Sequence, residues 1–145
     1  MRKFMLLILI ISIVISCKKN KQVAATCMTD MATISGSYKI TGCTYKGGPQ
    51  FPEIDYMLTL FPDACDRDNI YKFSANGSYQ IMDIGLVCSP PGDETGTWDM
   101  PAGTAMLKID GDLVLLENFD CKSLVIVNTD TQQQGDRLKL TLSRQ

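Results

Sequence analysis

The residues best suited to chemistry in this chain are its six cysteines, because the chain contains no histidine. The absence of histidine excludes serine–histidine triads, histidine general bases and histidine metal ligands. Six cysteines in 145 residues are typical of a protein from an oxidising compartment or of a metal site. No two of them form a CxxC pair. We therefore expect neither a zinc site nor a catalytic thiol.

The first cysteine, Cys17, follows a segment typical of a signal peptide. A basic pair at residues 2–3 precedes an apolar run at 4–15. That run is shorter than the roughly 20 residues of a membrane-spanning helix, so residues 1–16 are predicted to be a signal peptide. The sequence VISC at 14–17 resembles a bacterial lipobox. This resemblance implies cleavage before Cys17, a diacylglycerol on its sulfur and an acyl chain such as palmitate on the new amino group. A plain secreted protein is the alternative.

Residues 17–35 are predicted to be the lipidated cysteine and a flexible tether, because they are polar and small and show no periodicity. The basic side chains of this stretch could lie against anionic lipid headgroups; they are Lys18, Lys19 and Lys21. A solvated flexible linker is an equally good interpretation. Because this stretch is basic rather than acidic, we expect the protein in the bacterial cell envelope, on the periplasmic face of the outer membrane.

Two groups of acidic residues could do chemistry. The first surrounds Cys65 and offers oxygen ligands for Ca²⁺ from Asp63, Asp66, Asp68 and Asn69. It lacks the spacing of an EF-hand loop, so turn capping is the simpler interpretation. The second could supply the carboxylates of a glycosidase from Asp110, Asp112, Glu117 and Asp120. Acidic residues are common at hairpin tips, and the chain has no GxSxG motif. We therefore expect no catalytic residue, no metal and no cofactor.

The charge balance argues against another class of partner. Lysine and arginine number 14 against 16 aspartates and glutamates, so the net charge is −2, and it becomes −4 when the two basic residues of the leader are removed. Proteins that bind nucleic acids usually carry a basic face. No nucleic-acid partner is expected.

The elements that would position these residues are short strands. From residue 36 to 145, apolar and polar residues alternate between frequent turn residues, which is typical of an all-β barrel or sandwich. We predict hairpin turns at Asn76-Gly77 and Asp110-Gly111 and a short helical turn within 54–61. Eight strands joined mostly by short turns favour a small antiparallel up-and-down barrel, with a β-sandwich as the alternative. The predicted strands are 37–45, 70–74, 79–84, 96–100, 105–109, 113–117, 123–128 and 137–143.

These features resemble those of the lipocalin-like lipoproteins of Bacteroidetes-type bacteria. The resemblance covers nearly the whole chain and includes the lipobox, Gly36-Ser37-Tyr38 and Gly96-Thr97-Trp98. Its most specific part is the spacing of Cys65, Asp68, Phe73, Gly77, Cys88 and Trp98. The family implies a small antiparallel barrel, a disulfide joining Cys65 and Cys88, and no enzyme activity. Lipocalins proper carry Gly-x-Trp in the first strand, whereas this chain has its tryptophan in the fourth, so their ligand contacts are not transferred.

Five cysteines remain if Cys17 is lipidated, and five allow at most two intramolecular bridges. The Cys65–Cys88 pair implied by the resemblance is the first choice. Cys43–Cys121 is a second, because closure of a barrel could bring the first and seventh strands near each other. Cys27 would then be free, or it would pair with Cys121 instead.

Two non-catalytic functions remain open. In the first, the barrel binds a small apolar ligand in a cavity lined by Tyr38, Phe73, Tyr79, Trp98 and Met106, because aromatic and methionine side chains adapt to apolar ligands. In the second, these side chains form an ordinary core, and the protein is a structural or interaction module of the envelope. The filled barrel would then dock another envelope protein through an exposed apolar patch around Ile54–Phe61.

Overall fold

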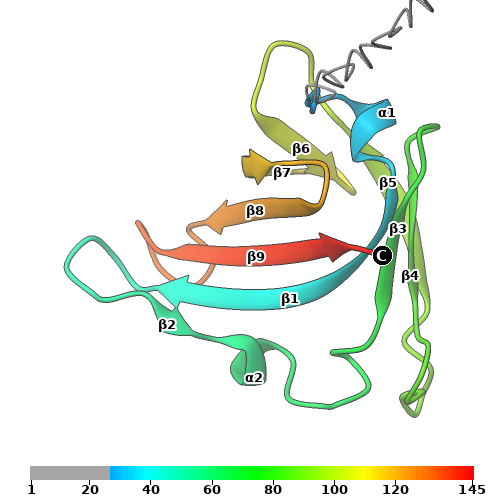
Figure 1. The fold of residues 1–145 in the computed structure, drawn as a ribbon. Helices are drawn as coiled ribbons and strands as arrows, with labels where there is room; N and C mark the ends of the chain where they lie inside the picture. The colour runs from blue at the N-terminus through cyan, green and yellow to red at the C-terminus, as the bar shows by residue number, and fades with distance from the viewer. Residues whose placement is uncertain (1–26) are drawn as a thin grey trace, which may run out of the picture.

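The computed structural model describes residues 27–145 (Figure 1). The signal peptide, Cys17 and the basic part of the tether lie outside these residues. The described elements are α1 (Met31–Ile34), β1 (Gly36–Lys46), β2 (Ile54–Asp55), α2 (Met57–Leu60), β3 (Ile70–Phe73), β4 (Ser78–Met82), β5 (Glu94–Asp99), β6 (Met106–Ile109), β7 (Asp112–Phe119), β8 (Ser123–Thr129) and β9 (Arg137–Arg144).

The described strands form one antiparallel sheet that closes on itself. Strands β1 and β3 to β9 follow one another in order, and β9 pairs with β1 from Tyr38↔Arg144 to Lys46↔Arg137. The eight predicted strands and the antiparallel barrel are therefore confirmed. Strand β2 is an extra edge strand that pairs only with the end of β1, at Thr44 and Tyr45. The sequence did not predict β2, and the predicted helical turn is the single turn α2 that follows it.

The two predicted hairpin turns differ in their backbone. Asp110 and Gly111 both have positive φ values, 49° and 101°, as a two-residue hairpin turn requires. At the other hairpin only Gly77 has a positive φ. Asn76 instead accepts the Ser78 backbone N–H with its side chain at 3.1 Å. This loop is longer than a two-residue hairpin turn. It consists of a turn followed by a glycine with a left-handed backbone conformation.

An aromatic cluster fills the barrel interior. Phe73 lies at its centre, with ring centroids 6.0 Å from Tyr38, 6.1 Å from Tyr79 and 5.3 Å from Trp98. All four side chains are at most 9% exposed and belong to one hydrophobic core. These four side chains pack against one another, and that they line a ligand cavity stays a prediction.

Met106 was also expected to line this cavity, but it lies on the other face of the sheet. Successive side chains of a strand point to opposite faces of the sheet. Leu107 is fully buried in the core, so Met106 lies on the outer face of β6, opposite Leu115.

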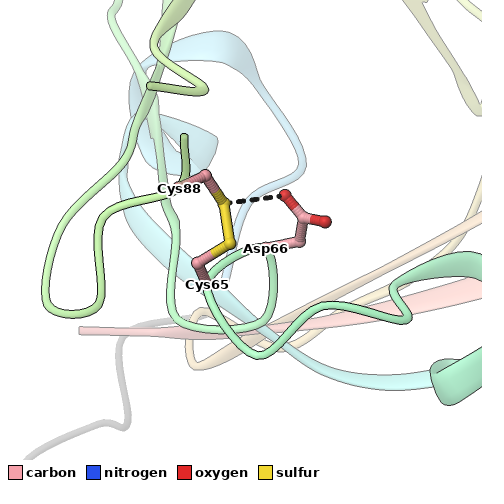
Figure 2. Close-up of side chains that lie close together, drawn as sticks. All are labelled: Cys65, Asp66 and Cys88. Carbon is pink, nitrogen blue, oxygen red and sulfur yellow. Dashed lines mark hydrogen bonds between the residues drawn. A yellow bond between two sulfur atoms is a disulfide. The ribbon is translucent and has the colours of Figure 1, made fainter. Parts of the chain in front are cut away.

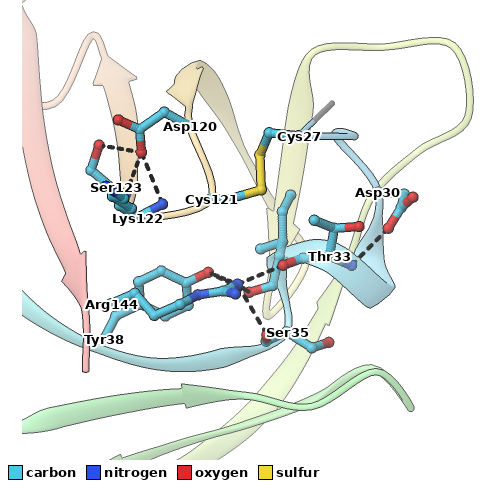
Figure 3. Close-up of a disulfide and its surroundings, with 11 residues drawn as sticks. Cys27, Asp30, Thr33, Ser35, Tyr38, Asp120, Cys121, Lys122, Ser123 and Arg144 are labelled. Atoms are coloured by element: carbon cyan, nitrogen blue, oxygen red, sulfur yellow. Dashed lines mark hydrogen bonds between the residues drawn. A yellow bond between two sulfur atoms is a disulfide. The ribbon is translucent and has the colours of Figure 1, made fainter. Parts of the chain in front are cut away.

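The predicted tether is shorter than expected. Residues 31–34 form the helical turn α1, whose N-cap residue Asp30 accepts the Thr33 N–H at 2.7 Å. Ile34 is fully buried in the core. Arg144 at the end of β9 donates hydrogen bonds to the carbonyl oxygens of residues 33–35 and to the Tyr38 hydroxyl (Figure 3). From Cys27 onward, the chain is part of the folded domain.

Two disulfides fix the described chain. Cys65 pairs with Cys88, as the family resemblance implied. Cys27 pairs with Cys121, which was the alternative to a free Cys27 (Figure 3). The Cys43–Cys121 pairing is wrong. Cys43 lies opposite Leu140, whereas the turn containing Cys121 meets β9 at Arg144, about 13 Å further along the strand. A disulfide spans Cα atoms only about 4.4–6.8 Å apart.

Candidate functional site

A pocket at the rim of the barrel is the candidate binding site. It lies where β1 ends and has a volume of about 450 Å³. This is within the range of roughly 300–1,000 Å³ that is usual for small-molecule sites. We call it the rim pocket, and its walls are Tyr45, Gly47, Phe51, Pro52, Ile54 and Gln133. The walls come from the β1–β2 loop, from both strands and from the β8–β9 loop.

The rim pocket adjoins a group of exposed apolar side chains, which we call the apolar patch. Its members are at least 38% exposed and lie between the end of β1 and α2; they are Phe51, Ile54, Leu58 and Leu60. The sequence predicted such a patch around Ile54–Phe61, and the structure places exposed apolar residues there. Phe51 and Ile54 belong to both features, so the pocket is the concave part of a larger apolar surface.

A buried carboxylate holds the loop behind the pocket in place. Asp136 is fully buried, although its carboxylate carries a charge. It accepts the backbone N–H groups of Thr131 and Gln132 at 2.8 Å each and that of Gln133 at 3.1 Å. The Tyr45 hydroxyl also donates to it, at 3.0 Å. Burial alone would raise the pKa of Asp136, but these donors lower it to about 2.

The same network links the two loops that form the pocket. Burial and the Asp136 carboxylate raise the pKa of Tyr45, so the Tyr45 hydroxyl stays protonated and can donate. The Gln133 side-chain amide donates to the Gly47 carbonyl, and that of Gln132 donates to the Tyr56 hydroxyl at 2.9 Å. A ligand in the rim pocket would therefore meet preorganised walls.

A second, larger cavity opens between α1, the loop after β5 and the end of β7. Its volume is about 720 Å³, and it is open to solvent. Met31, Met100 and Phe119 contribute apolar walls, but Asp30 and Glu117 lie among them. Charged carboxylates in the wall make this cavity less suited to an apolar ligand than the rim pocket.

Two of the acidic residues considered for glycoside hydrolysis, Asp110 and Asp120, make structural hydrogen bonds. Asp110 accepts the Tyr79 hydroxyl and the Thr97 N–H at the β6–β7 hairpin. Asp120 caps the turn at the other end of β7, where it accepts the Ser123 N–H at 2.6 Å. These carboxylates are thus occupied by structural hydrogen bonds at opposite ends of one strand.

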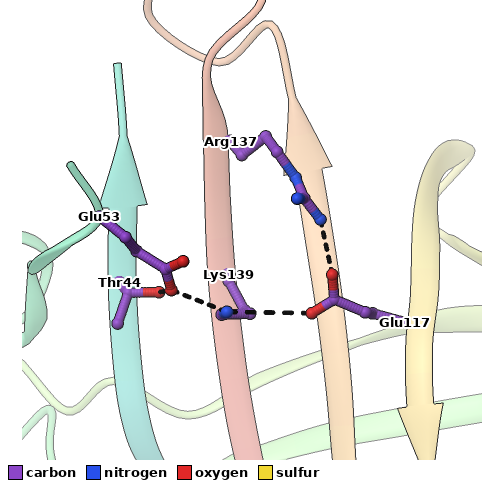
Figure 4. A network of polar contacts seen from close by, with 5 residues as sticks. All are labelled: Thr44, Glu53, Glu117, Arg137 and Lys139. Carbon is purple, nitrogen blue, oxygen red and sulfur yellow. Dashed lines mark hydrogen bonds and ion pairs between the residues drawn. The ribbon is translucent and has the colours of Figure 1, made fainter. Parts of the chain in front are cut away.

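Glu117 belongs to a network of charges on the outside of the barrel (Figure 4). It lies 2.6 Å from the Arg137 guanidinium and 4.0 Å from the Lys139 ammonium. Lys139 also pairs with Glu53 at 2.7 Å. The hydrogen bonds that Lys139 and Thr44 donate to the Glu53 carboxylate lower its pKa. The side chains are 30–47% exposed, so each pair contributes about 0–1 kcal/mol.

Four of the five cysteines among residues 27–145 are in disulfides, and the fifth is buried. Cys65, Asp66 and Cys88 lie close together, but both sulfurs are in a disulfide, so they present no thiolate (Figure 2). Cys43, the free cysteine of the described residues, is 1% exposed. Burial raises its pKa to about 11, so the thiol stays protonated and inert.

Sequence reasoning found the apolar patch but missed the residues that shape the pocket. Gln133 is far along the chain from Tyr45 and Phe51, and the pairing of β1 with β9 brings it to them. Asp136 follows a glycine before a strand and looks like an ordinary turn residue in the sequence. No local signal marks it as the buried anchor of a loop.

Comparisons with known proteins add no family or relative. A scan against protein-family models gave no match, and a search of curated proteins found no similar sequence. None of the helices formed by residues 27–145 has the length and apolar character needed to cross a bilayer.

Proposed function

We propose that this protein is a lipid-anchored, non-catalytic lipoprotein of the bacterial cell envelope whose lipocalin-like barrel binds a small apolar ligand in the rim pocket. The anchor is argued from the lipobox at residues 14–17. The site is argued from the pocket itself, because the barrel interior is filled by its aromatic core.

One observation carries the proposal: an apolar pocket of about 450 Å³ stays open between two loops that partly buried hydrogen bonds hold in place. Large apolar side chains at 50% exposure, such as Phe51 and Ile54, cost free energy in water unless something covers them. A small apolar ligand would bury their inner faces. The Gln133 side chain supplies a polar group in the wall, of the kind that orients ligands in such pockets.

The test is native mass spectrometry of the protein purified from its own membrane, followed by titration of the delipidated protein with dodecanoate. We expect a bound mass that is lost on mild denaturation, and saturable dodecanoate binding. Replacement of Phe51 and Ile54 by serine should weaken that binding about tenfold or more, because two apolar walls are removed.

Leu113→Ser is the matched control, since Leu113 is similarly exposed, at 57%, on β7 and away from the pocket. Equal loss of binding in the control and in the double variant would contradict a specific pocket. So would the absence of any saturable binding.

The apolar patch favours a second candidate, the docking of another envelope protein. Leu58 is 70% exposed and lies outside the rim pocket, so a small ligand would leave it uncovered. Under this alternative, Leu58→Ser disrupts a complex captured by chemical cross-linking in intact cells, whereas dodecanoate binding to the purified protein is unchanged. The two candidates therefore differ in which substitution matters.

A further inference from the structure

Three side-chain oxygens are buried without any hydrogen-bond partner at the end of the barrel where β3 begins and β4 ends. They are Asp68 Oδ1, Asn69 Oδ1 and Asp83 Oδ1. Asn69 is 6% exposed and Asp83 is 7% exposed, so both are more than nine-tenths buried. A buried acceptor without a partner costs free energy, and native proteins rarely leave one unsatisfied. Each of these three oxygens lacks a partner among the protein atoms of residues 27–145.

The strand register brings two of these groups together. Ile70 pairs with Met82, so Asn69 and Asp83 are the next cross-strand pair, one step beyond the ladder. Alternation places both on the same side of the sheet as Tyr71 and Ile81, which pack against the core. The two side chains therefore converge on the inner face.

The loop from residue 84 to 93 folds over this pair. Asp83 Oδ2 accepts the N–H groups of Cys88 at 3.0 Å and of Gly92 at 2.7 Å, which leaves Oδ1 as the unpaired oxygen. A Cβ atom on Gly92 would lie 3.6 Å from the Asp83 carboxylate and 4.0 Å from the Asn69 amide. Gly92 thus covers the space beside both side chains, and the Cys65–Cys88 disulfide pins the loop.

Asp68 approaches the same loop from the other side. Its Oδ2 accepts the Leu86 N–H at 2.9 Å. A Cβ atom on Gly85, where φ is +75°, would lie 2.5 Å from that oxygen, so only glycine fits there. As with Asp83, one carboxylate oxygen holds the loop and the other is buried and unpaired.

The surrounding charge is negative and uncompensated. The Asp93 carboxylate accepts the Asp83 N–H at 3.1 Å, and Asp66 lies beside Cys88. None of the carboxylates of Asp66, Asp68, Asp83 and Asp93 forms an ion pair with a lysine or arginine of residues 27–145. A cation would neutralise this charge and supply the missing partner of each oxygen.

We propose that Asp68, Asn69 and Asp83 bind a Ca²⁺ ion, which ties the 84–93 loop to the barrel. Carboxylate and amide oxygens are the hard ligands that Ca²⁺ takes, and its flexible geometry accepts six to eight of them, with water or backbone carbonyls completing the set. The sequence favoured turn capping for the acidic residues around Cys65, and no EF-hand spacing is present. The site is instead assembled from two separate loops.

The test is calorimetric titration of the EDTA-treated, full-length protein in detergent with CaCl₂, together with its thermal unfolding. We expect a Kd of about 10⁻⁴ to 10⁻³ M, as in extracellular calcium modules. The Tm should rise by about 5 °C when Ca²⁺ is at roughly ten times the Kd. No heat of binding and no rise in Tm at about 10 mM Ca²⁺ would overturn the proposal.

Two variants remove ligands in different ways. Asn69→Ala deletes an amide whose oxygen has no hydrogen-bond partner among the described residues. Asp83→Asn keeps an oxygen for the Cys88 and Gly92 amides but lowers the charge. Each should weaken Ca²⁺ binding about tenfold or more. If Asp83→Asn fails to fold, Asn69→Ala and the titration of the unaltered protein decide the question.

Asp63→Asn is the matched control, because Asp63 is an exposed acidic residue of the same region outside the cluster. It should change the Kd less than about twofold. Equal weakening by Asp63→Asn and Asn69→Ala, or an identical rise in Tm with Mg²⁺, would indicate a diffuse ion atmosphere and overturn the site.

Discussion

Asp136 binds three consecutive backbone amides and one tyrosine hydroxyl from a fully buried position. Its charge therefore organises the β8–β9 loop and, through Tyr45, the end of β1. The energetic consequence follows from the pKa, which falls from an ordinary 3.8 to about 2 in the folded protein. A lowered pKa means that the folded state prefers the charged carboxylate.

We predict that this preference appears in the pH dependence of stability. The contribution of Asp136 is fully present above about pH 4 and is lost as the pH falls through 2. Asp136→Asn should therefore lower the free energy of unfolding at pH 7 and flatten its decline between pH 4 and 2. Urea denaturation at several pH values measures both effects. A residual slope should remain, because the pKa values of Asp30, Asp110 and Asp120 are also lowered.

Asp112→Asn is the control for this experiment. Asp112 is exposed at the start of β7. It should leave the curve almost unchanged. If Asp136→Asn were as stable as the unaltered protein at pH 7, the anchoring role of Asp136 would be wrong.

The helical turn α1 shows how an element can depend on distant parts of the chain. A helix of four residues is far too short to form alone. The Cys27–Cys121 disulfide, the buried Ile34 and the hydrogen bonds from Arg144 hold it against the barrel (Figure 3). The chain entering the domain is thus fixed at the end of β9.

We predict that the two disulfides stabilise the fold unequally. In the chain-entropy account, a disulfide contributes about 2–4 kcal/mol, more for a longer loop. The Cys27–Cys121 separation is 94 residues and the Cys65–Cys88 separation is 23. Replacing Cys27 and Cys121 by serine should lower the free energy of unfolding more than the same change at Cys65 and Cys88. It should also speed amide exchange at Ile34 and Ser35. A larger loss from the second pair would contradict this order.

The elements that sequence could predict are those with a local pattern. In β9, leucines at 138, 140 and 142 alternate with polar residues. At the β6–β7 turn, Asp110 and Gly111 are residue types that accept the positive φ values of a two-residue hairpin turn. Strand β2 was missed because two residues carry no period, and it exists only through its pairing with β1. The rim pocket and the Cys27–Cys121 bridge depend on barrel closure, which joins segments from opposite ends of the domain.

At the scale of the whole molecule, the 11 residues of β1 lie between the start of the described chain and the rim pocket (Figure 1). The described chain begins at Cys27, which the disulfide to Cys121 holds near the start of β1. The rim pocket and the apolar patch lie where β1 ends. An anchor at Cys17 would therefore leave the proposed binding surface at the far end of β1, open to a ligand or a partner.

We predict that lipid, and not charge, retains the protein at the membrane. Three lysines near an anionic surface contribute about 1 kcal/mol each, whereas acyl chains contribute about 0.8 kcal/mol for every buried CH₂. Replacing Lys18, Lys19 and Lys21 by glutamine should therefore leave the protein in the membrane fraction, even after a high-salt wash. Cys17→Ser should release it. Intact mass under non-reducing conditions should match residues 17–145 with acyl groups and two disulfides. Release of the lysine variant, or the mass of an unlipidated chain, would mean that Cys17 is an ordinary cysteine and that the envelope anchor must be abandoned.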